Sequence, residues 1–293
     1  MTLEPDLRGR TALVTGASRG LGAATARRLA RSGADVVVTH RDNQALADAV
    51  ADEVRATGSR AWVHRVDLAE EADVDELFDR VAQDVGTLDL LAVNAAATSF
   101  RPLMTAERRH LARTFEISVQ GTLQCVQRAV PLMPEGGGRI VAVSGADTRT
   151  WIPGHGLLAA AKAAVESMVA YLACELGEHG TTVIGLSPGW LDGESVQTML
   201  GPFYEAGIAL ERETHPLRTA ATPDDIAEMV AWLCTDAARF LTGTTVEADG
   251  AGVFAFCGRY STVGARLAIA EAPPGTLEGA APAVPSGESA TQA

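Results

Sequence analysis

The stretch Thr15-Gly-Ala-Ser-Arg-Gly-Leu-Gly22 decides the fold of this chain. It follows an apolar run at 11–14 and opens an alanine-rich stretch at 23–30 that has the composition of a helix. Glycines suit such a turn because side chains would keep a pyrophosphate away from the backbone, and a helix N-terminus presents free amides and a positive dipole to phosphates. The sequence therefore predicts a strand, a phosphate-binding turn and a helix.

Apolar runs with the length of strands alternate with helical stretches along the chain. They lie at 11–15, 36–39, 61–66, 88–93, 139–144, 182–186 and 244–246. Strands that alternate with helices favour right-handed crossovers and a parallel sheet covered on both faces. We therefore predict a single-domain α/β fold with a doubly wound parallel sheet over residues 1–260. The composition of 261–293 shifts toward Ala, Pro, Gly, Ser and Glu, so we expect a C-terminal tail that is disordered from about 273.

The chain has a formal net charge of -13, with acidic residues scattered along it. This charge argues against nucleic acid and anionic membranes as partners. Residues 1–10 lack the apolar core of a signal peptide, and we identify no apolar run long enough to span a bilayer. We therefore expect a soluble, cytoplasmic protein.

The cysteines lie far apart, without the paired spacing of a metal site. They are Cys125, Cys174, Cys234 and Cys257. We expect reduced thiols in the core of a cytosolic protein and no bound metal.

Further motifs follow the glycine-rich turn in order: Asp67-Leu68, Asn94-Ala95-Ala96, Lys162 and Pro188-Gly189. Together with the turn, they resemble the short-chain dehydrogenase/reductase family over about 7–252. The resemblance implies a Rossmann fold, a nicotinamide cofactor and oxidoreductase activity. The positions that it assigns to cofactor binding are Gly16, Ser18, Arg19, Gly20, Leu21, Gly22, Asp67, Leu68, Asn94, Ala95, Ala96, Lys162, Pro188 and Gly189.

The second predicted strand ends in His40-Arg41, where dinucleotide folds place the residue that distinguishes the two nicotinamide cofactors. A carboxylate there binds ribose hydroxyls, whereas a basic residue accommodates a 2′-phosphate. Arg19 and Arg41 would flank one pocket, so we predict a preference for NADPH over NADH. The alternative is that Arg41 is a surface charge neutralised by Asp42.

The predicted catalytic segment departs from the pattern that the resemblance implies. The family supplies a proton from a tyrosine four residues before its lysine, and Leu158 stands there. Gly145, next to Ser144, occupies the serine position, and Ser118 occupies the asparagine position. Of these four positions only Lys162 is kept, and its proposed role is to hold the nicotinamide ribose.

Another side chain could supply the missing proton. His155 precedes Lys162 by seven residues, the spacing at which some enoyl reductases of the superfamily place their tyrosine, and histidine titrates near neutral pH. Tyr204 is a second candidate, although an apolar wall is its commoner role. Asp147 is a further carboxylate, but turn residues of this kind usually face water. The candidate catalytic residues are therefore Lys162, His155, Ser118, Ser144 and Tyr204.

The segment at about 190–216 corresponds to the substrate lid of the family and carries apolar residues at roughly helical spacing. They are Trp190, Leu191, Val196, Met199, Leu200, Phe203, Tyr204 and Ile208. Ordinary helix packing would also explain each of them singly, but together they suggest a bulky apolar substrate. Apolar residues on several sides of 111–132 and 158–176 resemble the family's subunit-pairing helices, so we expect a homodimer or homotetramer.

These observations favour an NADPH-dependent oxidoreductase with a non-standard proton donor, acting on an apolar metabolite by enoyl-type reduction. Two alternatives stay open, because fold does not settle function. One is a non-redox enzyme such as a cyclase, dehydratase or isomerase. The other is a cofactor-binding pseudoenzyme.

Overall fold

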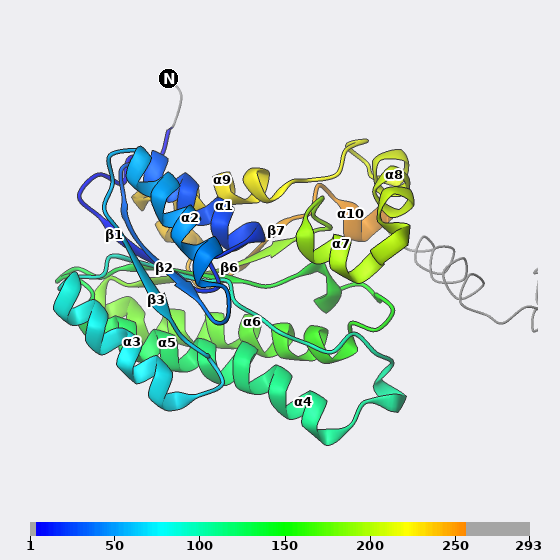
Figure 1. Ribbon diagram of the computed structural model, residues 1–293, viewed down its shortest axis with the longest axis horizontal. Coiled ribbons are helices and arrows are strands. Elements are labelled where there is room, and N and C mark those ends of the chain that lie inside the picture. Colours follow the sequence, from blue (N-terminus) through cyan, green and yellow to red (C-terminus); the bar gives the residue numbers. More distant parts are fainter. Residues whose placement is uncertain (1–3, 256–293) are drawn as a thin grey trace, which may run out of the picture.

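The computed structural model describes residues 4–255. A single parallel sheet in the order β3-β2-β1-β4-β5-β6-β7 runs through the molecule, with helices on both faces (Figure 1). Its strands are β1 (Thr11–Val14), β2 (Asp35–His40), β3 (Ala61–Arg65), β4 (Leu90–Val93), β5 (Arg139–Val143), β6 (Thr182–Pro188) and β7 (Thr245–Ala248). The predicted doubly wound parallel α/β fold is confirmed. Residues 256–293, with Cys257 and the expected tail, lie outside the described part.

One layer of helices lies above the sheet in Figure 1 and another below it. The upper layer holds α1 (Gly20–Arg31), α2 (Gln44–Ala56) and α9 (Pro223–Leu233). The lower layer holds α3 (Glu71–Asp84), α4 (Arg108–Phe115), α5 (Gly121–Ala129) and α6 (Gly156–Leu176). Each layer closes its own apolar core, and successive strand residues serve the two in turn: Val36 and Val38 face the upper core, whereas Val37 faces the lower one.

Short helices complete the described chain. They are η1 (Leu103–Thr105), η3 (Val130–Leu132), η4 (Ala146–Thr148), η5 (Gly177–His179), η6 (Gly201–Phe203) and η7 (Asp236–Leu241), with α7 (Glu194–Leu200), α8 (Tyr204–Thr214) and α10 (Gly252–Ala255). Between α4 and α5 the backbone widens into a π-helical turn, η2 (Glu116–Gln120), which interrupts the helix expected at 111–132. Such turns are rare and gather at functional sites, and this one carries Ser118.

Helix α6 corrects two expectations. Within residues 4–255, the segment Gly156–His179 is by length and composition apolar enough to cross a bilayer, contrary to the expectation that no run is long enough. A core helix passes the same test, and Leu157, Val165 and Val169 of α6 are buried in the described fold. Cys174 is exposed on this helix instead of lying in the core, whereas Cys125 and Cys234 are buried as expected.

Helices α7 and α8 make up the segment predicted to be the lid, beside the end of the sheet where β6 and β7 finish (Figure 1). The end of α8 is fastened to the turn after β7, because Nε2 of His215 lies 2.8 Å from the carbonyl oxygen of Asp249. Leu200 and Ile208 are buried. Part of the apolar lid sequence is therefore packing, as the alternative interpretation held.

Candidate active site

The glycine-rich turn between β1 and α1 has the geometry that its sequence predicts. Gly16 and Gly20 have φ angles of +64° and +54°, which side chains disfavour. A Cβ on Gly22 would lie 2.2 Å from the carbonyl oxygen of Gly16. Arg19, the N-cap residue of α1, makes no side-chain capping hydrogen bond, so its side chain does not occupy the amides of the first helical turn. The turn therefore fits a phosphate group.

Asn94 braces this turn from the end of β4. Its side-chain nitrogen donates to the carbonyl oxygens of Thr15 at 3.1 Å and Gly16 at 3.3 Å. The backbone amides of Asn94 and Ala95 donate in return to the hydroxyl of Thr15. The structure thus brings the Asn94-Ala95 motif directly against the phosphate-binding turn.

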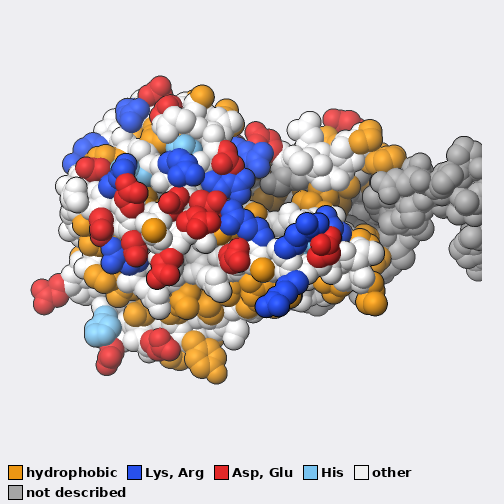
Figure 2. Space-filling model, turned by 60° about the horizontal axis from the view of Figure 1, so that its bottom comes forward, with side chains coloured by type: hydrophobic (Ala, Val, Ile, Leu, Met, Phe, Trp, Pro, Cys, Tyr) orange, Lys and Arg blue, Asp and Glu red, His pale blue; other side chains and the backbone are white. Residues whose placement is uncertain are grey.

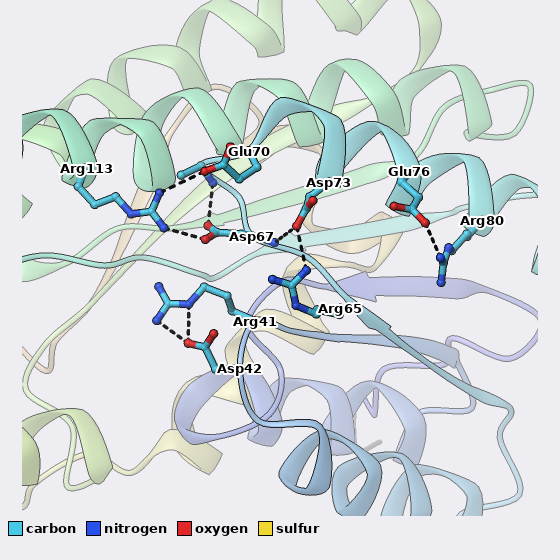
Figure 3. A network of polar contacts seen from close by, with 10 residues as sticks. Arg41, Asp42, Arg65, Asp67, Glu70, Asp73, Glu76, Arg80 and Arg113 are labelled. Carbon is cyan, nitrogen blue, oxygen red and sulfur yellow. Dashed lines mark hydrogen bonds and ion pairs between the residues drawn. The ribbon is translucent and has the colours of Figure 1, made fainter.

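The basic residues expected to distinguish the cofactors differ in whether their side chains already have partners within the protein. Arg19 is exposed, and its side chain makes no hydrogen bond or ion pair within residues 4–255. Arg41 pairs with Asp42 at 2.6 Å, as the alternative interpretation held (Figure 3). His40 is buried and its Nε2 lies 2.8 Å from Gln44, so this imidazole points into the protein. Of the three, Arg19 is the most available cation.

The carboxylate of Asp67 lies between the guanidinium groups of Arg41 and Arg113 in Figure 3. Burial alone would raise the pKa of Asp67, but the Ala69 amide, Arg113 at 2.7 Å and the charge of Arg41 together lower it. Asp67 is therefore an ionised carboxylate at neutral pH, paired with Arg113.

Lys162, the only lysine in the chain, is buried on α6. Its Nζ donates to the carbonyl oxygen of Val143 at 2.5 Å. Burial lowers its pKa to about 8, and the negative charges of Asp147 and Glu166 oppose that shift. Leu158 stands one helical turn before it.

Among the described residues, neither tyrosine is a convincing partner for Lys162. Tyr171 is 70% exposed on α6. Tyr204 donates its hydroxyl to Asp192 within the lid, and this hydrogen bond is the main reason that its pKa rises to about 12. A phenol held in this way is a weak acid at neutral pH, so its contacts favour a bracing role.

Asp147 does not face water as expected, because its side chain is only 5% exposed. Its Oδ2 lies 3.2 Å from Nδ1 of His155, whose side chain is 14% exposed. The ring of Phe100 lies against that imidazole with a centroid separation of 4.8 Å. Glycines shape the loop: Gly154 has a φ of +76°, and a Cβ on Gly156 would lie 2.6 Å from Leu103. The loop therefore delivers a histidine backed by a carboxylate to the same site as Lys162.

Ser144 takes part in a second network. Its hydroxyl donates to Glu166 at 2.6 Å, and Thr148 donates to the same oxygen at 3.0 Å. Nη1 of Arg149 forms ion pairs with Glu166 at 3.2 Å and with Glu247 of β7 at 2.7 Å. These contacts tie η4, which carries Asp147, to α6 and β7. Sequence reasoning missed Glu166, although its position one turn after Lys162 placed it on the same helix face.

Other residues predicted for the site and the lid lie on neighbouring segments: Leu68 is buried, and Pro188 ends β6. Ser118 is buried, and its hydroxyl has no hydrogen-bond partner in the part of the chain that the structure describes. Gly189, after β6, approaches the turn after β7, since a Cβ there would lie 3.1 Å from Asp249. Trp190 packs against Ile152, which brings the start of the lid onto the loop that carries His155.

The comparisons with known proteins cover nearly the whole described fold. The family described as Enoyl-(Acyl carrier protein) reductase matches residues 16–252. The 1-cyclohexenylcarbonyl-CoA reductase of Streptomyces collinus is 34% identical over 243 residues, which cover 83% of this chain and 86% of that protein. A solved short-chain dehydrogenase from Burkholderia cenocepacia J2315 in complex with NADP is 34% identical, with a TM-score of 0.77 over 85% of this chain and 99% of that one. The promiscuous reductase LugOII, solved as a catalyst of keto-reduction at C1 during lugdunomycin biosynthesis, is 33% identical, with a TM-score of 0.76 over 83% of this chain and 98% of that one.

Proposed function

The chain belongs to the short-chain dehydrogenase/reductase family, and we propose that it is an NADPH-dependent oxidoreductase that reduces the carbon–carbon double bond of an apolar enoyl substrate. The observation that carries the proposal is the pair formed by His155 and Asp147, which stands in for the missing tyrosine beside Lys162. The similarity to a cyclohexenylcarbonyl-CoA reductase supports the reaction type.

The cofactor would lie along the ends of β1, β2 and β4. The glycine-rich turn leaves space for a pyrophosphate, and Arg19 with Arg41 would bind a 2′-phosphate. The similarity to a dehydrogenase solved with NADP supports this choice. Lys162, after donating one hydrogen to Val143, keeps two for ribose hydroxyls.

When bound, the reduced nicotinamide would supply hydride to the β-carbon of the substrate. His155 would then give a proton to the α-carbon or oxygen of the resulting enolate. Asp147 would orient the ring through Nδ1 and stabilise its positive charge before transfer. Phe100 and the lid would exclude water from the imidazole.

This proposal is tested by measuring whether the purified protein reduces an α,β-unsaturated thioester. The reaction is monitored through the loss of NADPH absorbance. His155→Gln should lower kcat about 100-fold or more, because a positioned general acid contributes at least that factor. His179→Gln is the matched control, since His179 is an exposed histidine that pairs only with Glu178. Equal rates for the two variants would refute His155 as the donor, and turnover of ketones alone would favour keto-reduction of the kind that LugOII performs.

We also propose that the protein is a homodimer or homotetramer. Only 33% of the most apolar 18-residue stretch within Gly156–His179 is buried within one chain, and exposed residues along the helix include Ala163, Ala170 and Tyr171. Figure 2, which turns the bottom of the molecule toward the viewer, shows exposed hydrophobic side chains among charged ones. A second copy would cover this face. Sedimentation equilibrium at micromolar concentration should give a mass of two or four chains, and a single-chain mass would contradict it.

A further inference from the structure

One lid residue touches the proposed proton donor. The sulfur of Met199, on α7, lies 2.9 Å from Nε2 of His155. Asp147 occupies the other ring nitrogen, and Phe100 covers one side of the ring. Side chains from three separate segments therefore enclose the imidazole, and the contact with Met199 closes the nitrogen that faces the lid.

The chemistry of these neighbours indicates which ring nitrogen faces the substrate. A carboxylate accepts hydrogen bonds, so Nδ1 of His155 is the nitrogen that donates to Asp147 at 3.2 Å. Nε2 is then the nitrogen left to exchange a proton with a substrate. The sulfur of Met199 lies in direct contact with Nε2 at 2.9 Å, so it occupies the place that a substrate atom must take.

We propose that Met199 is the gate of this site: it shields Nε2 of His155 in the closed lid and must be displaced before the proton can be transferred. This inference rests on the proposed function, because it assigns a purpose to shielding the donor. Met199 is a positioning residue in this scheme, since it acts through His155.

Met199 lies on an assembly of short helices. Helix α7 packs mainly against α8 and η6 within the lid. Asp192 holds this assembly together by accepting hydrogen bonds from Tyr204 and, at 2.7 Å, from Arg212. The assembly is fastened at His215 to the turn after β7, so displacement of its α7 end would take Met199 away from His155 while leaving Asp147 in place.

The accessibility of His155 to diethyl pyrocarbonate, measured by peptide mass spectrometry without substrate, tests the gate. Exposed His179 in the same protein is the internal reference. Met199→Ala should raise the ratio of His155 to His179 modification about fivefold or more, because an unpopulated open state limits access in the wild-type protein. Met199→Leu keeps the bulk and should stay within about twofold of wild type.

Met229→Ala, on α9 in the upper core, is the matched control and should leave the ratio unchanged. An unchanged ratio in a folded Met199→Ala variant would overturn the gate, as would an equal increase in the control. The labelling needs no turnover, so it tests the shielding of His155 by Met199 separately from the proposed reaction. If His155→Gln reduces the substrate normally while Met199→Ala still exposes His155, the proposed function is wrong, whereas the shielding of His155 by Met199 is confirmed.

Steady-state kinetics give a second readout. If displacement of Met199 consumes substrate binding energy, Met199→Ala should lower KM about fivefold and leave kcat nearly unchanged. A loss of kcat with unchanged KM would instead mean that Met199 helps the chemical step, and would contradict the gate.

Discussion

Two glycines, one in the predicted cofactor-binding turn and one in the predicted catalytic segment, differ in what occupies the space where a side chain would lie. At Gly20, the first residue of α1, a Cβ would meet nothing within 4 Å, so the space stays open to a ligand. At Gly145, in the turn before α6, a Cβ would lie 2.8 Å from Oδ1 of Asp147. The first turn keeps its space for a phosphate, whereas the second has filled the space with its own carboxylate.

This difference teaches that an absent side chain can make room for a ligand or for another part of the protein. The sequence analysis places the serine of the family pattern at Gly145, and the carboxylate of Asp147 lies against this glycine and reaches His155. Gly145 therefore leaves room for the contact between Asp147 and His155.

The largest effect is expected from restoring the family pattern with Leu158→Tyr and Gly145→Ser together. The serine Cβ would lie 2.8 Å from Oδ1 of Asp147, so this carboxylate must shift and its Oδ2 contact with His155 should weaken. We expect the rate of enone reduction to fall about 100-fold, because the carboxylate orients the acid. Leu158→Tyr alone leaves the contact between Asp147 and His155 in place and is the control. The rate is measured by NADPH oxidation. An undiminished rate of enone reduction in the double variant would contradict the claim that Gly145 leaves room for a carboxylate needed in catalysis.

The next effect is on stability. Burial lowers the pKa of Lys162 to about 8 from an unfolded value of 10.5, so holding its charge at pH 7 costs about 3 kcal/mol. Below pH 8 both states carry the proton and the cost is complete. Between pH 8 and 10.5 the unfolded chain binds more protons than the folded one, so wild-type stability rises with pH. Urea unfolding should therefore find Lys162→Met more stable at pH 7, by a margin that shrinks toward pH 10.5.

The control for that measurement is Arg31→Met, an exposed cation on α1. Its effect on unfolding should be small and independent of pH over the same range. A constant advantage for Lys162→Met at every pH would contradict the assigned cause.

A smaller effect on stability is expected from a substitution in the glycine-rich turn. Gly22→Ala would place a Cβ 2.2 Å from the carbonyl oxygen of Gly16, and such overpacking costs about 1–3 kcal/mol. Calorimetry should also find weakened NADPH binding, because the turn must move. Gly177→Ala, where a Cβ meets nothing within 4 Å, is the control and should change neither measurement.

The smallest effect concerns the two arginines. Arg19→Ser should weaken NADPH binding about tenfold without changing NADH binding, since a hydrogen bond to a charged group contributes about 1.5–3 kcal/mol. Arg41→Ser should do less, because Asp42 already pairs with it. Equal losses for both cofactors, measured by fluorescence titration, would refute the assignment of the 2′-phosphate.

Local patterns in the sequence predicted most of the fold. The strands and the glycine-rich turn depend on periodicity and backbone requirements within a few residues, and Gly16 and Gly22 have the geometry that the motif requires. The π-helical turn was missed because its residues, Glu116–Gln120, have an ordinary helical composition.

The catalytic segment was less predictable because its contacts join residues that have no fixed spacing. His155 was a candidate from its distance to Lys162 along the helix. The burial of Asp147 depends on the absence of a side chain at Gly145 and on the fold of a loop, neither of which a turn-residue preference reveals. Met199 comes from a lid helix distant in sequence, so only the tertiary structure places it on His155.

The crowding between Gly145 and Asp147 also couples these two positions. A side chain at 145 would bring a Cβ within 2.8 Å of Oδ1 of Asp147, so the carboxylate would have to shift to make room for it. The two positions are therefore not independent, and an engineered change at one has to be designed together with the other.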